Sequence, residues 1–149
     1  MPFDDVLAAT NISASGMAAE RMRMEVVAHN IANASSTRTA EGGPYRRKDL
    51  VFAAVLGESR RSLSTGDTTR LGGVEVVDMV DDMSDPIPVY EPGHPDADAN
   101  GMVRYPNVRL PVEMTNLITA SRAYEANVRV ALTLKQMMEQ SLVLMRGGA

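Results

Sequence analysis

The chain has 149 residues, a length that suits one domain. Its formal net charge of −4 argues against a nucleic-acid-binding protein, since such domains are usually basic. It has no cysteine, which excludes disulfides, thiolate nucleophiles and cysteine-based zinc sites. The N-terminal residues 1–5 are acidic and no apolar run follows them. We therefore expect no cleaved secretory signal, and export, if it occurs, by a route that needs none.

The first predicted element is a helix over residues 5–34, a segment without proline and with a single glycine, Gly16. Ile12, Ala19 and Val26 recur at heptad spacing, and Met22 lies at an interleaved position. A second apolar set follows the same period on another face of the helix. The two faces together predict contacts with more than one partner.

The middle of the chain, residues 36–110, is predicted to form β-hairpins and loops, because seven of the eight prolines lie between positions 44 and 111. Apolar, β-branched runs bounded by glycine predict strands at 50–56 and 74–80. Shorter strands are expected at 87–90 and 102–105.

A second long helix is predicted from Pro111 to about Met145, since no glycine or proline interrupts this segment. Its apolar residues follow spacings of three and four for more than four heptads, which favours a coiled coil. We therefore expect an α+β fold in which the long N- and C-terminal helices pair as a coiled coil, with a small β-rich segment between them. The subunit-assembly seam is predicted at Ile12, Ala19, Met22, Val26, Met114, Leu117, Tyr124, Val128, Met138 and Leu142.

Charge is segregated in the middle of the chain. Residues 38–70 include seven arginine or lysine side chains, whereas residues 71–103 carry eight acidic ones. Two interpretations remain open: these are two solvated loops, or the basic and acidic patches of neighbouring copies meet and fix their register. The basic cluster at Tyr45–Lys48 similarly fits either a solvated loop or a contact with an anionic surface.

One stretch resembles a calcium site: residues 96–101 read Asp-Ala-Asp-Ala-Asn-Gly, the opening of a calcium-binding loop. The twelfth position, which needs a bidentate carboxylate, is Asn107, and Arg104 places a cation within the loop. An Asx-rich turn explains the same residues. A calcium-dependent binding module is therefore the alternative function, and the turn is the interpretation that the residues favour.

Other chemistry finds no support in the sequence. The two histidines, His29 and His94, lie far apart, and neither has the neighbours that zinc requires. No serine lies in a nucleophile elbow and no phosphate-binding loop occurs. We predict that the protein is not an enzyme, and that it has no cofactor, no nucleic-acid partner and no small-molecule substrate.

Five motifs in order along the chain resemble those of bacterial flagellar rod and hook proteins, and in particular those of the proximal rod subunits. The first runs from Ile12-Ser13-Ala14-Ser15-Gly16-Met17 to Ala28-His29-Asn30-Ile31-Ala32-Asn33-Ala34. The others are residues 42–48, 90–97, 100–108 and 121–127. The matching positions include Asn30, Asn33, Gly42, Gly43, Pro44, Tyr45, Arg46, Arg47, Lys48, Ser121, Arg122, Ala123, Tyr124, Glu125, Ala126 and Asn127. His29 departs from the pattern, since asparagine is common at this position.

The resemblance implies a structural subunit of the flagellar basal body whose terminal helices polymerise into a hollow axial shaft. It divides the chain into an inner-tube helix at 1–35, an outer β-rich segment at 36–110 and a coiled-coil helix at 111–149. Its implied partners are copies of itself, other rod subunits, the flagellar type III export apparatus and the membrane ring at the rod base. The implied location is the rod in the periplasm. Asn30 and Asn33 are expected to end the first helix, because asparagine supports left-handed caps.

Overall fold

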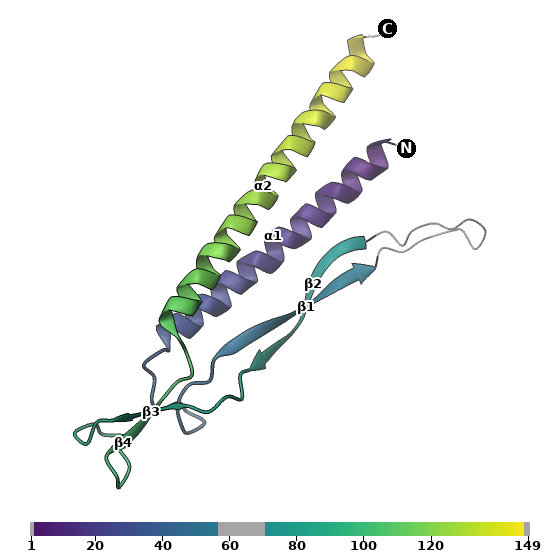
Figure 1. Ribbon diagram of the computed structural model, residues 1–149. Helices are drawn as coiled ribbons and strands as arrows, with labels where there is room; N and C mark the ends of the chain where they lie inside the picture. The colour runs from purple at the N-terminus through teal and green to yellow at the C-terminus, as the bar shows by residue number, and fades with distance from the viewer. Residues whose placement is uncertain (1, 57–70, 148–149) are drawn as a thin grey trace. The chain divides into compact units, whose positions relative to one another are not determined.

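The computed structural model describes residues 2–56 and 71–147, and the chain is α+β, as predicted. Helix α1 spans Pro2–Ala32 and helix α2 spans Leu110–Gly147 (Figure 1). Four strands lie between them: β1 (Lys48–Leu56), β2 (Leu71–Asp81), β3 (Ile87–Tyr90) and β4 (Met102–Tyr105). Residues 57–70, between β1 and β2, lie outside the described residues.

The strands form two separate two-stranded sheets, β1 with β2 and β3 with β4. In the second sheet the strands are antiparallel, and Val89 lies opposite Val103. The bounds of β3 and β4 agree with the prediction, while β1 and β2 are each longer than the apolar runs that predicted them. Isolated two-stranded sheets are marginally stable in water, so both sheets need support from the helices or the loops.

The chain forms two compact units, each built from several segments. The first contains residues 1–21, 52–77 and 121–149, and the second contains residues 22–51 and 78–120. Both helices and both strands of the first sheet contribute to each unit. Whether residues 1–35, 36–110 and 111–149 correspond to inner and outer parts of an assembly stays a prediction.

In the first unit, two adjacent residues of α1 contact the other elements. The Ser15 hydroxyl oxygen accepts the backbone N–H of Val74 in β2 at 3.1 Å, and it donates to the Ile12 carbonyl at 2.8 Å. A Cβ atom at Gly16 would lie 2.8 Å from the side-chain nitrogen of Asn127 in α2. The Ser15-Gly16 pair is therefore the point on α1 where β2 and α2 both make close contact.

In the second unit, the core is small and mostly aliphatic. Val27, Val103, Val108 and Ala120 are buried, and they come from α1, β4, the following loop and α2. Two polar side chains, Asn30 and Glu113, are fully buried in the same unit. Such burial is stable only when every polar atom has a hydrogen-bonding partner.

Helix α1 ends close to the predicted position. Asn33 donates two hydrogen bonds to the His29 carbonyl. One comes from its backbone nitrogen, at 3.1 Å, and the other from its side-chain Nδ2, at 2.9 Å. Asn33 thus follows directly after the last residue of α1, and a left-handed cap at this position stays a prediction. The expectation for Asn30 was wrong, since Asn30 lies inside the last turn of α1 and its side chain is used elsewhere.

The close approach of β2 to α1 predicts that Gly73→Ala is destabilising. Gly73 has a φ of +121°, and an added Cβ would overlap the Ser15 hydroxyl. The strained backbone alone costs about 1–2 kcal/mol. We expect a loss of that size or more in the free energy of unfolding, measured by urea denaturation of the purified chain. Gly93→Ala is the matched control, because a Cβ there meets open space; equal losses in both variants would contradict the proposed contact.

Candidate functional site

A buried polar cluster lies at the centre of the second unit, and we define it by Asn30, Tyr45, Arg47, Lys48 and Glu113. These residues come from the last turn of α1, the start of β1 with the segment that leads into it, and the first turn of α2. Asn30 and Glu113 are fully buried, and the side chain of Arg47 is 18% exposed. The cluster therefore joins three segments that are far apart in the sequence.

Asn30 uses the full hydrogen-bonding capacity of its amide. Its Oδ1 accepts the Tyr45 hydroxyl at 2.9 Å and the backbone N–H of Lys48 at 2.9 Å. Its Nδ2 donates to the Lys48 carbonyl at 2.8 Å and to Glu113 Oε2 at 3.2 Å. Because one amide pairs with both backbone groups of Lys48, Asn30 takes the place of a neighbouring strand at the start of β1.

Glu113 is a carboxylate without water contact, and two donors compensate for this. Arg47 Nε donates to Glu113 Oε1 at 2.7 Å, while Asn30 donates to the other oxygen. Burial acts to lower the pKa of Arg47, but its hydrogen bonds to Glu113 and Asp49 outweigh burial and raise that pKa. A buried charge is tolerated when it is paired and hydrogen-bonded in this way.

Further contacts extend the cluster to the neighbouring loops. The backbone N–H of Arg47 donates to Asn107 Oδ1 at 3.1 Å, and its carbonyl accepts from Asp82 N at 2.7 Å. Lys48 Nζ pairs with Asp81 at 3.0 Å, and this hydrogen bond raises the pKa of Lys48. Burial of the Tyr45 hydroxyl raises the pKa of Tyr45. No buried side-chain nitrogen or oxygen in the described ranges lacks a hydrogen-bonding partner.

The sequence-predicted motif at 42–48 thus has a structural role within the chain. Gly42 and Gly43 have φ values of +87° and +81° and form a turn in which Thr39 N donates to the Gly43 carbonyl. This turn precedes Tyr45, Arg47 and Lys48, which all belong to the cluster. Of the basic residues in this stretch, Arg46 is exposed, whereas Arg47 and Lys48 are partly buried. Neither interpretation of the Tyr45–Lys48 cluster anticipated these contacts.

Segregated charges also meet within the chain. The basic segment and the acidic segment are joined by the Lys48–Asp81 pair and by Arg38–Asp96, which is longer at 3.7 Å. Glu125 and Arg129 pair along α2 at 4.0 Å. These pairs are exposed and contribute little to stability. Part of the charge segregation is therefore explained without a neighbouring copy.

The calcium alternative gains no support from the loop geometry. Asp98 Oδ1 accepts the backbone N–H groups of Asn100 and Met102, and these hydrogen bonds lower the pKa of Asp98. Asp96 instead accepts the Thr37 hydroxyl at 2.8 Å. In the part of the chain that the structure describes, no group of three or more metal-binding side chains comes together. The loop is built as an Asx turn.

The predicted seam residues differ widely in exposure. Ala19 is buried, and a partly buried group follows: Val26, Leu117, Tyr124, Val128 and Met138. The remaining four, Ile12, Met22, Met114 and Leu142, are 42–56% exposed. The seam as an intermolecular contact stays a prediction, and so does coiled-coil pairing of the two helices.

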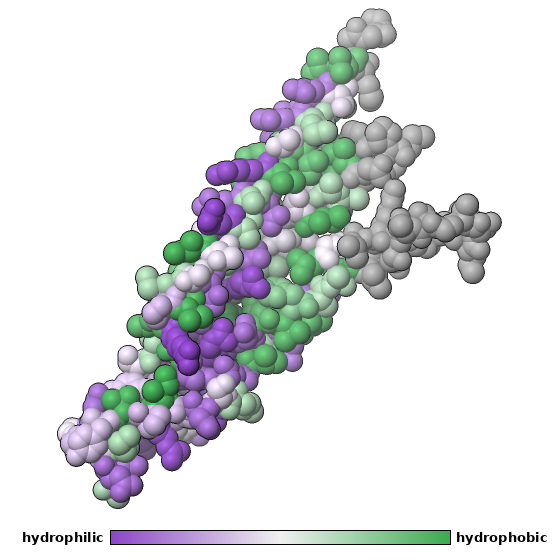
Figure 2. Space-filling view, in the orientation of Figure 1, coloured by the Kyte–Doolittle hydropathy of each residue, from purple (hydrophilic) through white to green (hydrophobic). Residues whose placement is uncertain are grey.

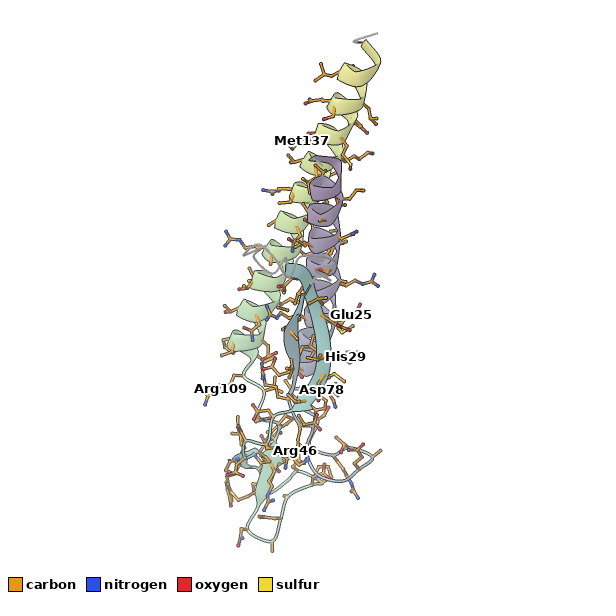
Figure 3. All side chains as sticks on the ribbon, turned by 90° about the vertical axis from the view of Figure 1, so that its right-hand side faces the viewer. Glu25, His29, Arg46, Asp78, Arg109 and Met137 are labelled. Carbon is orange, nitrogen blue, oxygen red and sulfur yellow. The ribbon has the colours of Figure 1, made fainter. Side chains whose placement is uncertain are left out.

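A second exposed surface on α2 was not predicted as a contact. We define the α2 exposed stripe as Ala126, Val130, Thr133, Met137, Ser141 and Leu144, at spacings of three and four. None of the six is charged, and Val130, Met137 and Leu144 are 47%, 50% and 78% exposed. Figure 2 shows both apolar and polar side chains near the C-terminal end of α2, and Figure 3 labels Met137.

The hydroxyls of the α2 exposed stripe are already bonded. Thr133 Oγ1 donates to the Arg129 carbonyl at 3.0 Å, and Ser141 Oγ donates to the Met137 carbonyl at 2.9 Å. A hydroxyl that bonds back to its own helix leaves the carbon atoms of the side chain facing outward. The stripe therefore presents an essentially apolar surface to solvent.

The polar side chains described above hold segments of the chain together. Comparison with known proteins gives the class of the protein, which is structural. A family model described as "Flagella basal body rod protein" matches residues 11–38, and one described as "Flagellar basal body rod FlgEFG protein C-terminal" matches residues 99–144. These two ranges contain α1 from Asn11 onward and most of α2.

Several curated relatives align over most of the chain, and each is named flagellar basal-body rod protein FlgC. The relative from Salmonella typhimurium is 42% identical over 134 residues, which cover 90% of this chain and 93% of the relative. That from Borreliella burgdorferi is 39% identical over 145 residues, covering 92% and 95%. That from Bacillus subtilis is 41% identical over 140 residues, covering 89% and 93%. The chain belongs to the flagellar basal-body rod protein family.

The sequence analysis missed Glu113 as a member of the polar cluster and Asn107 as a residue that contacts it. Glu113 stands between Val112 and Met114 in the first turn of α2, where an acidic residue is also favoured by the helix dipole. The helix dipole therefore accounts for Glu113 without any buried partner. Its partners Asn30 and Arg47 lie 83 and 66 positions away, and the local sequence around Glu113 does not identify them.

The pairing of Glu113 predicts that Glu113→Gln destabilises the fold although it preserves shape. A glutamine oxygen can accept from Arg47 or from Asn30, and the other donor then faces an NH2 group. One buried donor is left without an acceptor, which costs about 1–3 kcal/mol. We expect that loss in the free energy of unfolding in urea. Glu139→Gln removes only an exposed pair with Lys135 and should change stability by less than about 1 kcal/mol; a loss in Glu113→Gln no larger than this would contradict the role of the cluster.

A second substitution tests the strand-like role of Asn30. Asn30→Asp keeps the acceptor for Tyr45 and for the Lys48 N–H, but it places an oxygen against the Lys48 carbonyl and against Glu113. We expect the free energy of unfolding to fall by more than about 2 kcal/mol, because the hydrogen bonds to the Lys48 carbonyl and to Glu113 are replaced by repulsions. The repulsion from Glu113 is between like charges. Amide hydrogen exchange at Lys48 should accelerate. Asn100→Asp, in the exposed turn at 98–101, is the control and should leave exchange at Lys48 unchanged.

Proposed function

We propose that the chain is a non-catalytic structural subunit of the proximal rod of the bacterial flagellar basal body. The observation that carries the proposal is the alignment with curated rod proteins, at 39–42% identity over about nine tenths of this chain for the three relatives described. The same relatives support the prediction that the protein is not an enzyme. Its partners are copies of itself and other rod subunits, and it assembles into a hollow shaft that transmits torque.

The finer parts of the proposal rest on the family resemblance. They are export through the flagellar type III apparatus without a cleaved signal, location in the periplasm, and contact with the membrane ring at the rod base. Among the described residues, no helix combines the length and the apolar character needed to cross a membrane.

Exposed apolar side chains on both terminal helices support assembly through these helices. On α1 they include Leu7, Ile12 and Met22, and on α2 they include Ile118 and Leu132. Isolated apolar side chains on a surface are ordinary, but a row along one helix face is typical of an interaction site. We place the assembly contact on the α2 exposed stripe, because its burial would desolvate no charge and no free hydroxyl.

In a helical assembly, each subunit contacts its neighbour through two different surfaces. When a patch on one subunit binds a different patch on the next, the same contact can be repeated from subunit to subunit, and an open filament forms if the rotation does not close into a ring. The exposed face of α1 in the first unit carries Leu7, Asn11, Ala14 and Ala18, which are also uncharged. Its small side chains allow a neighbouring helix to approach closely. We propose this face as the surface that receives the α2 exposed stripe of the next copy.

The proposal predicts that Val130→Asp combined with Met137→Asp abolishes rod assembly without unfolding the chain. Both positions are half exposed, so the isolated chain should keep its free energy of unfolding within about 1 kcal/mol. In a strain whose own copy is deleted, the variant should give no motility and no rods in purified basal bodies. Gln136→Asp, exposed on the same turns but off the stripe, is the matched control and should restore both.

Two other outcomes separate the parts of the proposal. If the wild-type chain itself failed to restore rods in a strain lacking the corresponding rod subunit, the proposed function would be overturned. If the double variant restored motility as the control does, the rod function would stand, and the stripe would not be the contact. Leu117→Asp with Val128→Asp then tests the predicted seam, although these residues are partly buried and stability must be measured in parallel.

A further inference from the structure

In the second unit, the start of β1 and the end of β2 form a ribbon with two different sides. The Arg47 carbonyl accepts the backbone N–H of Asp82 at 2.7 Å, and Lys48 Nζ pairs with Asp81 at 3.0 Å. Neighbouring residues of an extended segment point to opposite sides. Arg46, Lys48 and Asp81 accordingly line a depression on one side of the ribbon. Arg47 and Asp82 line a separate hollow on the other side.

An exposed turn accompanies Arg46 on the first side. Residues 40–43 are all exposed, and a Cβ atom added at Gly42 or at Gly43 would meet no atom within 4 Å. Glu41 of this turn and Arg46 border the same depression. Within the described ranges, neither of these two side chains forms a hydrogen bond or an ion pair. We define residues 40–43 together with Arg46 as the projecting face.

The hollow on the second side has a volume of about 330 Å³, and we call it the receiving hollow. Asp85 and Arg109 line it, and both are exposed (Figure 3 labels Arg109). Neither side chain has a hydrogen bond or an ion pair in the part of the chain that the structure describes. Ile87 and Val112 add apolar surface to the lining, at 42% and 50% exposure.

Asp82 also borders the receiving hollow, but it is satisfied within the chain. Its Oδ1 accepts the Ser84 hydroxyl at 2.6 Å and the Ser84 backbone N–H at 2.9 Å, and these hydrogen bonds lower the pKa of Asp82. Arg46 of the same chain contributes less to this lower pKa than the hydrogen bonds do, and no ion pair joins Arg46 to Asp82. The charges left for a neighbour to pair at the two sides are therefore those of the projecting face and those of Asp85 and Arg109.

We propose that the projecting face of one copy docks into the receiving hollow of a second copy, with Arg46 paired to Asp85 and Glu41 paired to Arg109. Each side supplies one cation and one anion, so opposite charges meet at both pairs. The aliphatic stem of the entering arginine covers the apolar part of the lining. Because the two surfaces lie on opposite sides of one ribbon, the contact joins different surfaces and is repeated from copy to copy. The inference rests on the proposed function in one respect, the assembly of copies of this chain.

The same charges select the register of neighbouring copies. A shift that brings Arg46 to Arg109 places two cations together, and one that brings Glu41 to Asp85 places two carboxylates together. An exposed ion pair contributes little attraction, whereas like charges forced together at an interface are costly. The docked turn therefore excludes wrong registers more than it holds the copies together. Arg46 lies in the basic segment and Asp85 in the acidic one, so the contact also uses charges that no pair within the chain explains.

Exchange of charges tests the pair of Arg46 and Asp85. In a strain whose own copy is deleted, Arg46→Glu should give roughly tenfold fewer rods in purified basal bodies, because two carboxylates then face each other. Arg46→Glu combined with Asp85→Arg in the same chain restores opposite charges and should recover the rods. Arg104→Glu is the matched control, since Arg104 is exposed and lines neither the depression nor the receiving hollow. It should leave the number of rods unchanged.

The outcomes separate this contact from the rod function. Both substituted positions are exposed, so the free energy of unfolding in urea should stay close to that of the wild type. If the wild-type chain restores rods and Arg46→Glu does so equally well, the contact is overturned and the proposed function stands. A double variant that assembles no better than Arg46→Glu would also overturn the contact. If the wild-type chain itself restores no rods, the proposed function fails and this inference fails with it.

Cross-linking tests the same contact without reversal of a charge. The chain has no cysteine, so an introduced cysteine is its single thiol. One chain carries Arg46→Cys, a second carries Asp85→Cys, and both are made in one cell. A short bismaleimide added to the basal bodies should then give a cross-linked dimer, detected with an antibody against the chain. A disulfide would not suffice, because an arginine–aspartate ion pair holds the two backbones farther apart than a disulfide spans.

Two controls make the cross-linking result decisive. Cells that make only one of the two chains should give monomer, because each surface meets the other surface and not itself. Cells that combine Asp85→Cys with Arg104→Cys should also give monomer. Absence of the dimer in the first mixture would overturn the proposal, and so would a dimer of equal yield in either control.

Discussion

The burial of one carboxylate, Glu113, is the constraint on which the second unit depends. A carboxylate removed from water is stable only with compensating donors, and Glu113 obtains them from Arg47 and Asn30. Each donor lies on a different segment, so the requirement can be met only when α1, the segment leading into β1 and α2 are brought together. An apolar contact would tolerate sliding of these segments against each other. The Glu113 carboxylate fixes their register, because a shift of any one segment would leave the buried charge without a donor.

Asn30 extends this constraint to the sheet. Its amide satisfies both backbone groups of Lys48 and so replaces the strand that the edge of β1 lacks at that point. Two-stranded sheets need such support. In the first unit the same need is met by Ser15, which accepts the Val74 N–H of β2. Side chains of α1 thus support the sheet in both units, and a rod subunit obtains a defined middle segment from a chain with very few buried apolar residues.

The sequence predicted the elements well and the polar cluster poorly, for physical reasons. Helices and strands follow from local periodicity and from the positions of glycine and proline, and β3 and β4 were predicted with the observed bounds. The role of Asn30 is different, because its partners are distant and their approach is decided by packing. Arg47 stood in a run of basic residues that suggested an exposed surface. Local charge could not reveal that the middle of this run faces inward.

The same distinction applies to the proposed assembly contact. Polar groups that would resist desolvation are bonded within the chain, whether in the cluster or, as for Thr133 and Ser141, to their own helix. What remains exposed on the α2 exposed stripe is mostly carbon, which gains free energy when a neighbour covers it. Had the stripe carried charges, each would need a partner in the neighbouring copy, and the contact would tolerate only one register. An uncharged face of small and aliphatic side chains accepts related surfaces, which suits the proposed contacts with copies of the chain and with other rod proteins.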